Sequence, residues 1–220
     1  MKEGENMLKD EKNSNFVKNQ NPYNKYKTII DNDILKLYYQ FTHLKNIYRQ
    51  GWLTSLLGMN YENKVESVAD HSWSVTMLAM SIIEKYHLDL DIGKCMKLAM
   101  IHELGEIYAG DFIPNQVTKE EKHKLEEKAV DELLNSIEYD NDFKELWLEY
   151  ENKESPEADF IKQVDKLECI LQAGSYGLNS KYIKGAESIT LPCLKEILED
   201  VYKITQDNEL PLCFRQENER

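Results

Sequence analysis

Apolar side chains recur every three or four residues through most of this 220-residue chain, and runs that alternate apolar and polar residues are scarce. This spacing is typical of amphipathic helices that each bury one face. Nine glycines and five prolines leave few positions that interrupt a helix. We therefore expect an all-α fold, a bundle of helices. The expected helices cover residues 31–50, 67–86, 92–109, 118–138, 142–154, 157–177 and 191–205.

The domain organisation expected from composition is simple. The chain can bury one sizeable core, since 41% of its residues are hydrophobic. We expect a single domain over residues 29–206. A polar, Asn- and Lys-rich arm over residues 1–28 is expected to be mobile, and residues 207–220 are expected to form a loose tail.

Charge and cysteine content exclude several classes of function. The net charge of −13 opposes binding to long nucleic acid, but it leaves room for one small anion in a local pocket. The four cysteines form no CxxC pair, which favours a reducing cytoplasmic setting over a disulfide framework. No apolar run approaches the roughly 18 residues that cross a bilayer, and the N-terminus lacks the apolar segment of a secretory signal. We expect a soluble, cytoplasmic protein.

Ionisable residues lie where the periodicity predicts a buried helix. In "MIHELGEIYAGDF", residues 100–112, the side chains of His102, Glu103 and Glu106 stand inside the most apolar of the expected helices. Asp111 follows one residue after a glycine. Burying even a neutral polar group without a partner costs about 2–7 kcal/mol. These residues therefore need a partner that the apolar helix does not supply.

Two further helices place an ionisable group in an apolar stripe, namely His71 in the second helix and Asp165 in the sixth. Taken singly, a hydrogen-bonded core histidine and a solvated or lysine-paired aspartate explain them better than a metal does. Together the helices offer two imidazoles and two carboxylates, from His71, His102, Glu103 and Asp165. This set suits one divalent ion of Mn, Fe, Co, Ni or Zn, which would neutralise the carboxylates. The HExxH motif of zinc proteases is absent because Glu106 replaces its second histidine.

The sequence segments around these residues resemble those of a known protein family. They are "RQGW" at 49–52, "ESVADHSW" at 66–73, "HELGEIYAGDFIP" at 102–114 and "ELWLEYENKESPEADFIKQVDKLECILQA" at 145–173. In order and spacing they resemble the HD-domain metal-dependent phosphohydrolases, and more narrowly the 5′-deoxynucleotidase branch. The resemblance covers residues from about 34 to 178. One position departs from it, because Glu103 stands where the family pairs its histidine with an aspartate.

The resemblance implies an HD-domain bundle with a metal site between helices, and a role for each matching residue. The metal ligands would be His71, His102, Glu103 and Asp165. Glu106 and Asp111 match the family's acid–base carboxylates, which would exchange protons with the attacking water and the leaving ribose oxygen. Arg49 matches the phosphate-binding arginine, a role that suits a bidentate guanidinium.

Other features are less specific. Trp52 matches a residue beside the sugar and base of the substrate, although a packed core tryptophan explains it nearly as well. The charged run "KEEKHKLEEK", residues 119–128, is most simply a solvated helix face. The resemblance also implies a homodimer.

The resemblance therefore implies a divalent-metal-dependent phosphomonoesterase that releases phosphate from small nucleotides, most of all from deoxyribonucleoside 5′-monophosphates. The alternative is a degenerate HD-domain module that binds a nucleotide or a protein partner without turnover. Glu106 and Asp111 favour the enzyme, whereas Glu103 favours the degenerate module. A phosphodiesterase is a weaker possibility because no second metal's ligand set stands out.

Overall fold

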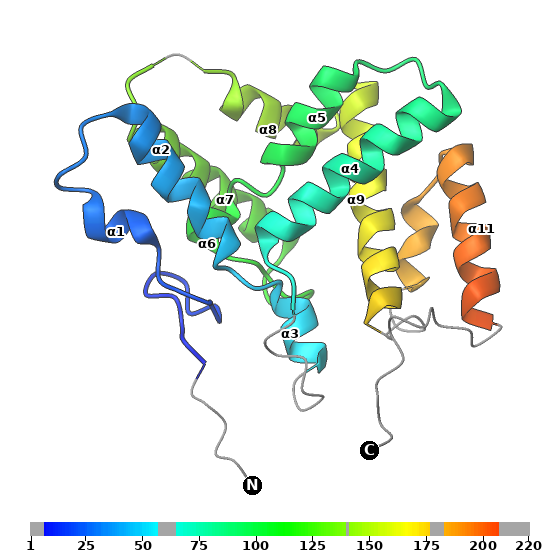
Figure 1. Ribbon diagram of the computed structural model, residues 1–220, viewed down its shortest axis with the longest axis horizontal. Coiled ribbons are helices and arrows are strands. Elements are labelled where there is room, and N and C mark those ends of the chain that lie inside the picture. Colours follow the sequence, from blue (N-terminus) through cyan, green and yellow to red (C-terminus); the bar gives the residue numbers. More distant parts are fainter. Residues whose placement is uncertain (1–6, 57–64, 140, 177–182, 207–220) are drawn as a thin grey trace, which may run out of the picture. The chain divides into compact units, whose positions relative to one another are not determined.

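The computed structural model describes residues 7–56, 65–139, 141–176 and 183–206, and the segments it describes are helices, turns and isolated β-bridges (Figure 1). The prediction of an all-α fold is confirmed. The helices are α1 (Pro22–Tyr26), α2 (Asp33–Phe41), η1 (Thr42–Lys45), α3 (Gln50–Leu56), α4 (Val68–Tyr86), α5 (Ile92–Ile101), α6 (Glu106–Ala109), α7 (Lys119–Leu134), α8 (Phe143–Asn152), α9 (Pro156–Ser175), η3 (Ile183–Ser188) and α11 (Pro192–Gln206).

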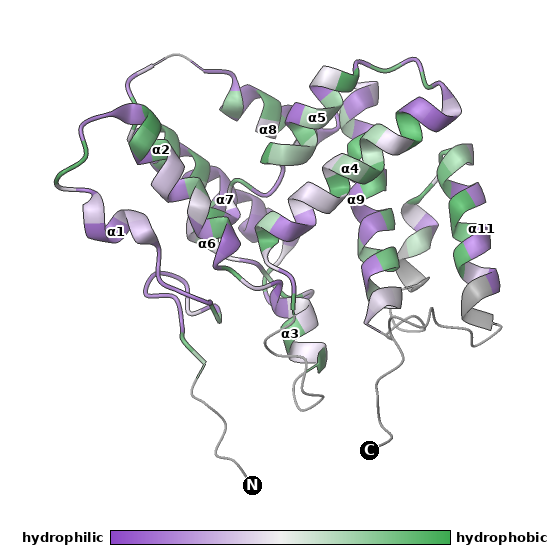
Figure 2. Ribbon diagram, in the orientation of Figure 1, coloured by the Kyte–Doolittle hydropathy of each residue, from purple (hydrophilic) through white to green (hydrophobic). Residues whose placement is uncertain are grey.

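The chain divides into two compact units, and the divisions fall within α4, α5 and α8. The first unit contains residues 1–73 and 101–148, and the second contains residues 74–100 and 149–220. Hydrophobic and hydrophilic residues share the long helices in both units (Figure 2). No helix among the described residues combines the length and the hydropathy needed to cross a membrane.

The first unit has a core to which the N-terminal segment, α2, η1, α6, α7 and α8 all contribute. Helix α6 packs against both α7 and η1. Burial of large apolar side chains is the main stabilising contribution to such a core, at about 25 cal/mol for each Å² removed from water. Its buried residues are Val17, Leu37, Leu44, Ile47, Val68, Leu104, Ile107, Val130, Leu133, Ile137 and Trp147.

In the second unit, α9 packs against η3 and α11. A serine cap and a proline begin α9, since the Ser155 hydroxyl accepts the N–H of Ala158 and Pro156 occupies the first turn. The side-chain oxygen of Gln163 accepts the N–H groups of Thr190, at 2.8 Å, and Leu191, at 3.0 Å. These bonds fix the chain that leads into α11.

Residues 7–28, part of the arm expected to be mobile, include side chains that contact the rest of the first unit. The carboxylate of Asp10 lies 2.8 Å from His43 Nε2, and both side chains are buried. Val17 is 2% exposed and forms a β-bridge with Ile47. Polar residues are thus held by specific hydrogen bonds that composition does not reveal. Residues 1–6 and the expected tail, residues 207–220, lie outside the described residues.

Two expected helices are interrupted. The segment expected over 31–50 forms α2, the 3₁₀ helix η1 and the first residue of α3, and on α2 the side chains of Ile34, Tyr38 and Phe41 are exposed. The segment expected over 92–109 ends as α5 at Ile101 and resumes as α6 at Glu106. The intervening turn is closed by bonds from Leu104 N–H to the Ile101 carbonyl and from Glu106 N–H to the Glu103 carbonyl.

Candidate metal and phosphate site

A short antiparallel pairing brings Arg49 next to the start of α4. The N–H of Arg49 donates to the Glu66 carbonyl at 3.1 Å, and the N–H of Val68 donates to the Ile47 carbonyl at 3.0 Å. A capping box then begins α4, because Ser67 N–H donates to the Asp70 carboxylate and Asp70 N–H donates to the Ser67 hydroxyl. His71 therefore lies in the first turn of a firmly capped helix.

The turn after α5 places the other ionisable residues of the site. A Cβ atom on Gly105 would lie 2.6 Å from the Cβ of Glu126 on α7, so the turn and α7 approach more closely than any other residue type permits. Gly110, with φ of +83°, then turns the chain so that Asp111 follows α6. Glycines at these two positions set where Glu106 and Asp111 lie.

Two imidazoles and one carboxylate converge in the first unit. His71 Nε2 and His102 Nε2 are 3.4 Å apart, and Glu103 Oε1 lies 3.8 Å from the first and 3.7 Å from the second. All three side chains are buried. A tetrahedral ion with bonds of about 2.1 Å separates its ligand atoms by about 3.4 Å. The spacing of these three donors therefore fits one divalent ion.

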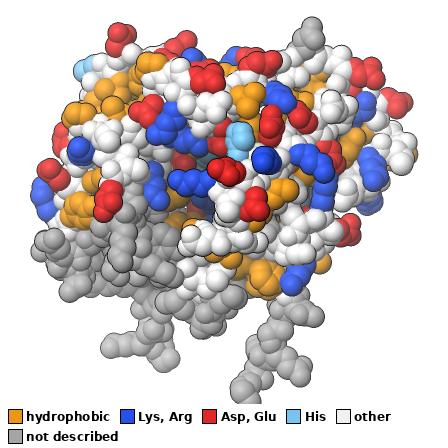
Figure 3. Space-filling model, turned by 180° about the vertical axis from the view of Figure 1, so that it is seen from behind, with side chains coloured by type: hydrophobic (Ala, Val, Ile, Leu, Met, Phe, Trp, Pro, Cys, Tyr) orange, Lys and Arg blue, Asp and Glu red, His pale blue; other side chains and the backbone are white. Residues whose placement is uncertain are grey.

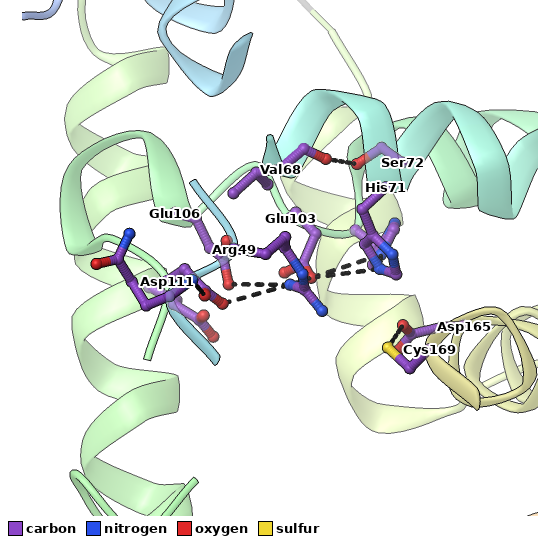
Figure 4. A network of polar contacts seen from close by, with 12 residues as sticks. Arg49, Val68, His71, Ser72, Glu103, Glu106, Asp111, Asp165 and Cys169 are labelled. Atoms are coloured by element: carbon purple, nitrogen blue, oxygen red, sulfur yellow. Dashed lines mark hydrogen bonds and ion pairs between the residues drawn. The ribbon is translucent and has the colours of Figure 1, made fainter. Parts of the chain in front are cut away.

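Arg49 lies at the centre of the carboxylates beside this group (Figure 4). Its Nη1 is 2.8 Å from Glu103 Oε1, 3.3 Å from Asp111 Oδ1 and 4.0 Å from Glu106 Oε1. The other oxygen of Asp111 accepts the backbone N–H of Gln50 at 2.5 Å. One guanidinium therefore links residues from the turn, from α6 and from the loop after it.

The pKa values of Glu103 in the turn and of Glu106 at the start of α6 are shifted in opposite directions. Burial opposes the charge of Glu103, but His102, Arg49, Lys122 and His71 outweigh it and lower its pKa to about 2. Burial raises the pKa of Glu106, and the charges of Glu103 and Asp111 raise it further. Both oxygens of Glu106 are buried, and neither has a hydrogen-bond donor among the residues that the structure describes. A cation bound close to Glu106 would stabilise the charged form of this buried carboxylate.

Comparison with known proteins identifies the family. The sequence profile of the HD domain matches residues 41–190. The chain belongs to the HD-domain family. This matched segment includes His71, the 102–111 segment and Asp165, so the family resemblance seen in the sequence is confirmed.

Two curated relatives of this HD-domain chain are both named 5′-deoxynucleotidases. The chain is 39% identical to the 5′-deoxynucleotidase HDDC2 of Bos taurus over 138 residues, which are 60% of this chain and 62% of the bovine protein. It is 33% identical to the 5′-deoxynucleotidase hdd1 of Schizosaccharomyces pombe over 174 residues, which are 73% of this chain and 84% of the yeast protein. The match thus spans less than two thirds of the bovine and human proteins.

Solved structures show the same fold. A conserved hypothetical protein from Pyrococcus furiosus has a TM-score of 0.63 at 30% identity, over 77% of this chain and 99% of that one. A predicted metal-dependent phosphohydrolase from Magnetospirillum magnetotacticum has a TM-score of 0.61 at 23% identity, over 80% and 93%. At this lower identity the likeness concerns the fold alone.

Asp165, the predicted fourth ligand, belongs to the second unit of the HD-domain chain. Its Oδ2 accepts the hydroxyl of Tyr150 at 3.0 Å, and its Oδ1 lies 3.9 Å from the Cys169 sulfur (Figure 4). The tyrosine hydroxyl orients the carboxylate on α9. Its assignment to the metal remains a prediction.

Trp52, one of the two predicted substrate-binding residues, is packed in the first unit. Its side chain is 4% exposed, and its Nε1–H donates to Glu66 Oε1 at 2.8 Å. This arrangement is that of the core tryptophan considered above. A contact between Trp52 and the substrate stays a prediction.

The sequence reasoning missed two residues of the site, Lys122 and Glu126, which it placed on a solvated helix face. Lys122 Nζ lies 3.1 Å from Glu126 Oε1 and 3.9 Å from Glu106 Oε1. Carboxylate oxygens of Glu103, Glu106 and Glu126 lie within 4.8 Å of one another. The spacing of charges along α7 does not distinguish the face that carries Lys122 and Glu126 from the exposed faces. The sequence signal that could have indicated this face is Gly105, which has no side chain and so lets α7 approach the turn.

Proposed function

We propose that this HD-domain protein is a divalent-metal-dependent phosphomonoesterase whose substrates are small nucleotides, foremost deoxyribonucleoside 5′-monophosphates. The observation that carries the proposal is the convergence of His71, His102 and Glu103 next to the Arg49–carboxylate cluster. The names of the curated relatives support the substrate class.

The proposed metal ligands are His71, His102 and Glu103, with Asp165 as the fourth. The family resemblance and the hydrogen bond that orients the Asp165 carboxylate support the fourth ligand. The donor set of two imidazoles and two carboxylates suits Mn, Fe, Co, Ni or Zn. When bound, a divalent ion supplies Lewis-acid stabilisation of the phosphoryl oxygens and a lower pKa for water.

The side chains around the proposed metal ligands have distinct tasks in this proposal. Arg49 exchanges its carboxylate partners for phosphate oxygens, which a guanidinium binds through two parallel hydrogen bonds. Glu106 accepts the proton of the attacking water, and its raised pKa makes it a stronger base than an exposed carboxylate. Asp111, held by the Gln50 N–H, delivers a proton to the leaving ribose oxygen. Trp52 is assigned to the sugar and base side by family resemblance.

Two further proposals concern the state of the protein. We propose a homodimer, from the family resemblance, and sedimentation at micromolar concentration tests it. We also propose a cytoplasmic location. Cys95, Cys169 and Cys193 form no disulfide among the residues that the structure describes, as is usual in a reducing compartment.

The second candidate is a degenerate HD-domain module that binds a nucleotide or a protein partner without turnover. The specific observation in its favour is the 2.8 Å ion pair between Arg49 and Glu103, which occupies the guanidinium needed for a phosphate. An enzyme must break this pair in each cycle, whereas a module that binds a protein partner need not.

Phosphate release separates the two candidates. Metal-stripped protein is assayed on a panel of ribo- and deoxyribonucleoside 5′-monophosphates, with Mn, Co, Ni, Zn or Mg added singly. The enzyme predicts metal-dependent release with a preference for the deoxy sugars. Metal-loaded protein that binds these nucleotides and hydrolyses none of them would establish the degenerate module.

A further inference from the structure

Lys122 begins the part of α7 that faces the site. A capping box fixes the start of this helix, because the Thr118 hydroxyl accepts Glu121 N–H and the Glu121 carboxylate accepts Thr118 N–H. The close approach of Gly105 to Glu126 then fixes which side of α7 is turned toward α6. Lys122 lies one helical turn before Glu126 and therefore shares that side.

The ammonium group of Lys122 combines close acidic neighbours with access to solvent. The side chain of Lys122 is 39% exposed, whereas those of Glu106 and Glu126 are 1% and 7% exposed. Burial lowers the pKa of Lys122, but the charges of Glu103, Glu106 and Glu126 outweigh that effect and raise it. The group therefore remains a cation at neutral pH, at the rim of an otherwise buried acidic cluster.

Lys122 and Arg49 face the same carboxylate oxygen. Arg49 Nη1 lies 4.0 Å from Glu106 Oε1, and Lys122 Nζ lies 3.9 Å from that same atom, so the two nitrogens are less than 8 Å apart. A phosphate that accepts one hydrogen bond of about 2.8 Å on each of two oxygens bridges nitrogens up to about 8 Å apart. The two cations are therefore close enough to hold one phosphate group.

The protein surface as a whole does not attract anions. Acidic and basic side chains are mixed over the face drawn in Figure 3, and the chain has 40 acidic and 27 basic residues. Long-range attraction by the protein's net charge would disfavour a nucleotide. The positive charge that a phosphate dianion requires must therefore come from within the site, from the proposed metal ion and from individual basic side chains.

We propose that Lys122 is a second phosphate-binding residue, which contacts the phosphate from α7 while Arg49 contacts it from the other side of Glu106. This inference rests on the proposed function, because it assigns Lys122 to the same substrate. Glu126 holds the ammonium in place when no phosphate is present, in the way that Glu103 and Asp111 hold Arg49.

The test compares Lys122→Met and Lys122→Gln with Lys122→Arg. Lys124→Met, a change at an exposed lysine of the same helix, is the matched control. Inorganic phosphate is the probe, titrated directly into metal-loaded protein by calorimetry and also used as an inhibitor of nucleotide hydrolysis. Loss of one charge-assisted hydrogen bond predicts a 10- to 100-fold weaker phosphate affinity, about the same rise in KM, and a smaller change in kcat. Lys122→Arg and the control should remain within about threefold of the wild type.

The direct titration keeps this inference separate from the proposed function. Wild type that hydrolyses nothing, but binds phosphate more tightly than Lys122→Met, refutes the phosphomonoesterase and supports the Lys122 contact. Unchanged phosphate affinity in either neutral variant, shown to be folded by circular dichroism, overturns the inference. A fall in kcat with unchanged KM and phosphate affinity also overturns it, because Lys122 would then act on Glu106 alone.

Discussion

The close approach between Gly105 and α7 gives a prediction of stability that the structure makes quantitative. In Gly105→Ala, the new Cβ would lie 2.6 Å from the Cβ of Glu126 and 3.0 Å from its Cα. Ordinary contacts between such carbons begin at about 3.4 Å, and neither atom is the end of a flexible side chain. The turn and α7 must therefore move apart by most of an ångström.

The expected cost follows from this displacement. Overpacking of this kind typically costs about 1–3 kcal/mol. The backbone of Gly105 has φ −61° and ψ −27°, which alanine adopts freely, so alanine regains roughly 0.4–1 kcal/mol by restricting the unfolded chain. We expect a net loss of about 1–2 kcal/mol and a melting temperature lower by about 2–8 °C.

The control for this experiment is Gly51→Ala, because a Cβ on Gly51 in α3 would meet no atom within 4 Å. This change should leave stability unchanged or raise it slightly. Thermal unfolding followed by circular dichroism, at one protein concentration, measures both variants. A Gly105→Ala protein that melts at or above the temperature of Gly51→Ala would show that α7 does not approach the turn as described.

Three further variants probe the site and the N-terminal segment. Glu106→Gln should retain the metal and lower kcat by about 10²–10⁴-fold, because the amide cannot accept a proton. Metal content and single-substrate kinetics measure both effects, and full activity would show that Glu106 is not the base. Arg49→Ala should mainly raise KM for a nucleoside 5′-monophosphate, and unchanged kinetics would place the phosphate elsewhere. For Asp10, burial opposes ionisation, but the hydrogen bonds from His43 and the Lys12 N–H outweigh it and lower the pKa. The stabilising effect of Asp10 is therefore fully present above its unfolded pKa of about 3.9 and disappears as pH falls through the lower folded value. Urea unfolding of wild type and Asp10→Asn should differ by about 1–3 kcal/mol at pH 6, and the difference should disappear as the pH falls below the folded pKa of Asp10; a constant difference would contradict an ionised Asp10 carboxylate.

Local patterns in the sequence predict most of the helices but not their interruptions. The apolar periodicity and the Ser67–Asp70 cap predict α4 almost to its ends, and the same reasoning finds α7, α8, α9 and α11. The break between α5 and α6 lies where Gly105 approaches Glu126, which is far from it in sequence, so local periodicity does not reveal it. Periodicity also does not say which apolar face is covered, as the exposed Ile34 and Tyr38 of α2 show.

The candidate site was predictable to a similar degree. Ionisable residues in apolar stripes identify His71, His102 and Glu103, because burial of such groups requires a partner. Lys122 was not identified, since a lysine in a strongly charged helix is usually solvated and only the packing of α7 shows otherwise. The ion pairs of Arg49 likewise depend on the antiparallel pairing of residues 47–49 with 66–68.

The central proposal, that His71, His102 and Glu103 belong to a divalent-metal site, is tested most directly by metal binding. Metal-stripped wild type, His71→Ala and His102→Ala are dialysed against Mn, Co, Ni or Zn, and bound metal per chain is measured by mass spectrometry. His87→Asn is the control, because His87 is exposed and has φ of +50°, which asparagine tolerates. We expect one ion per chain in wild type and His87→Asn, and loss of that ion in both other variants. Stoichiometric binding of unchanged affinity by folded His71→Ala and His102→Ala would contradict the proposed site.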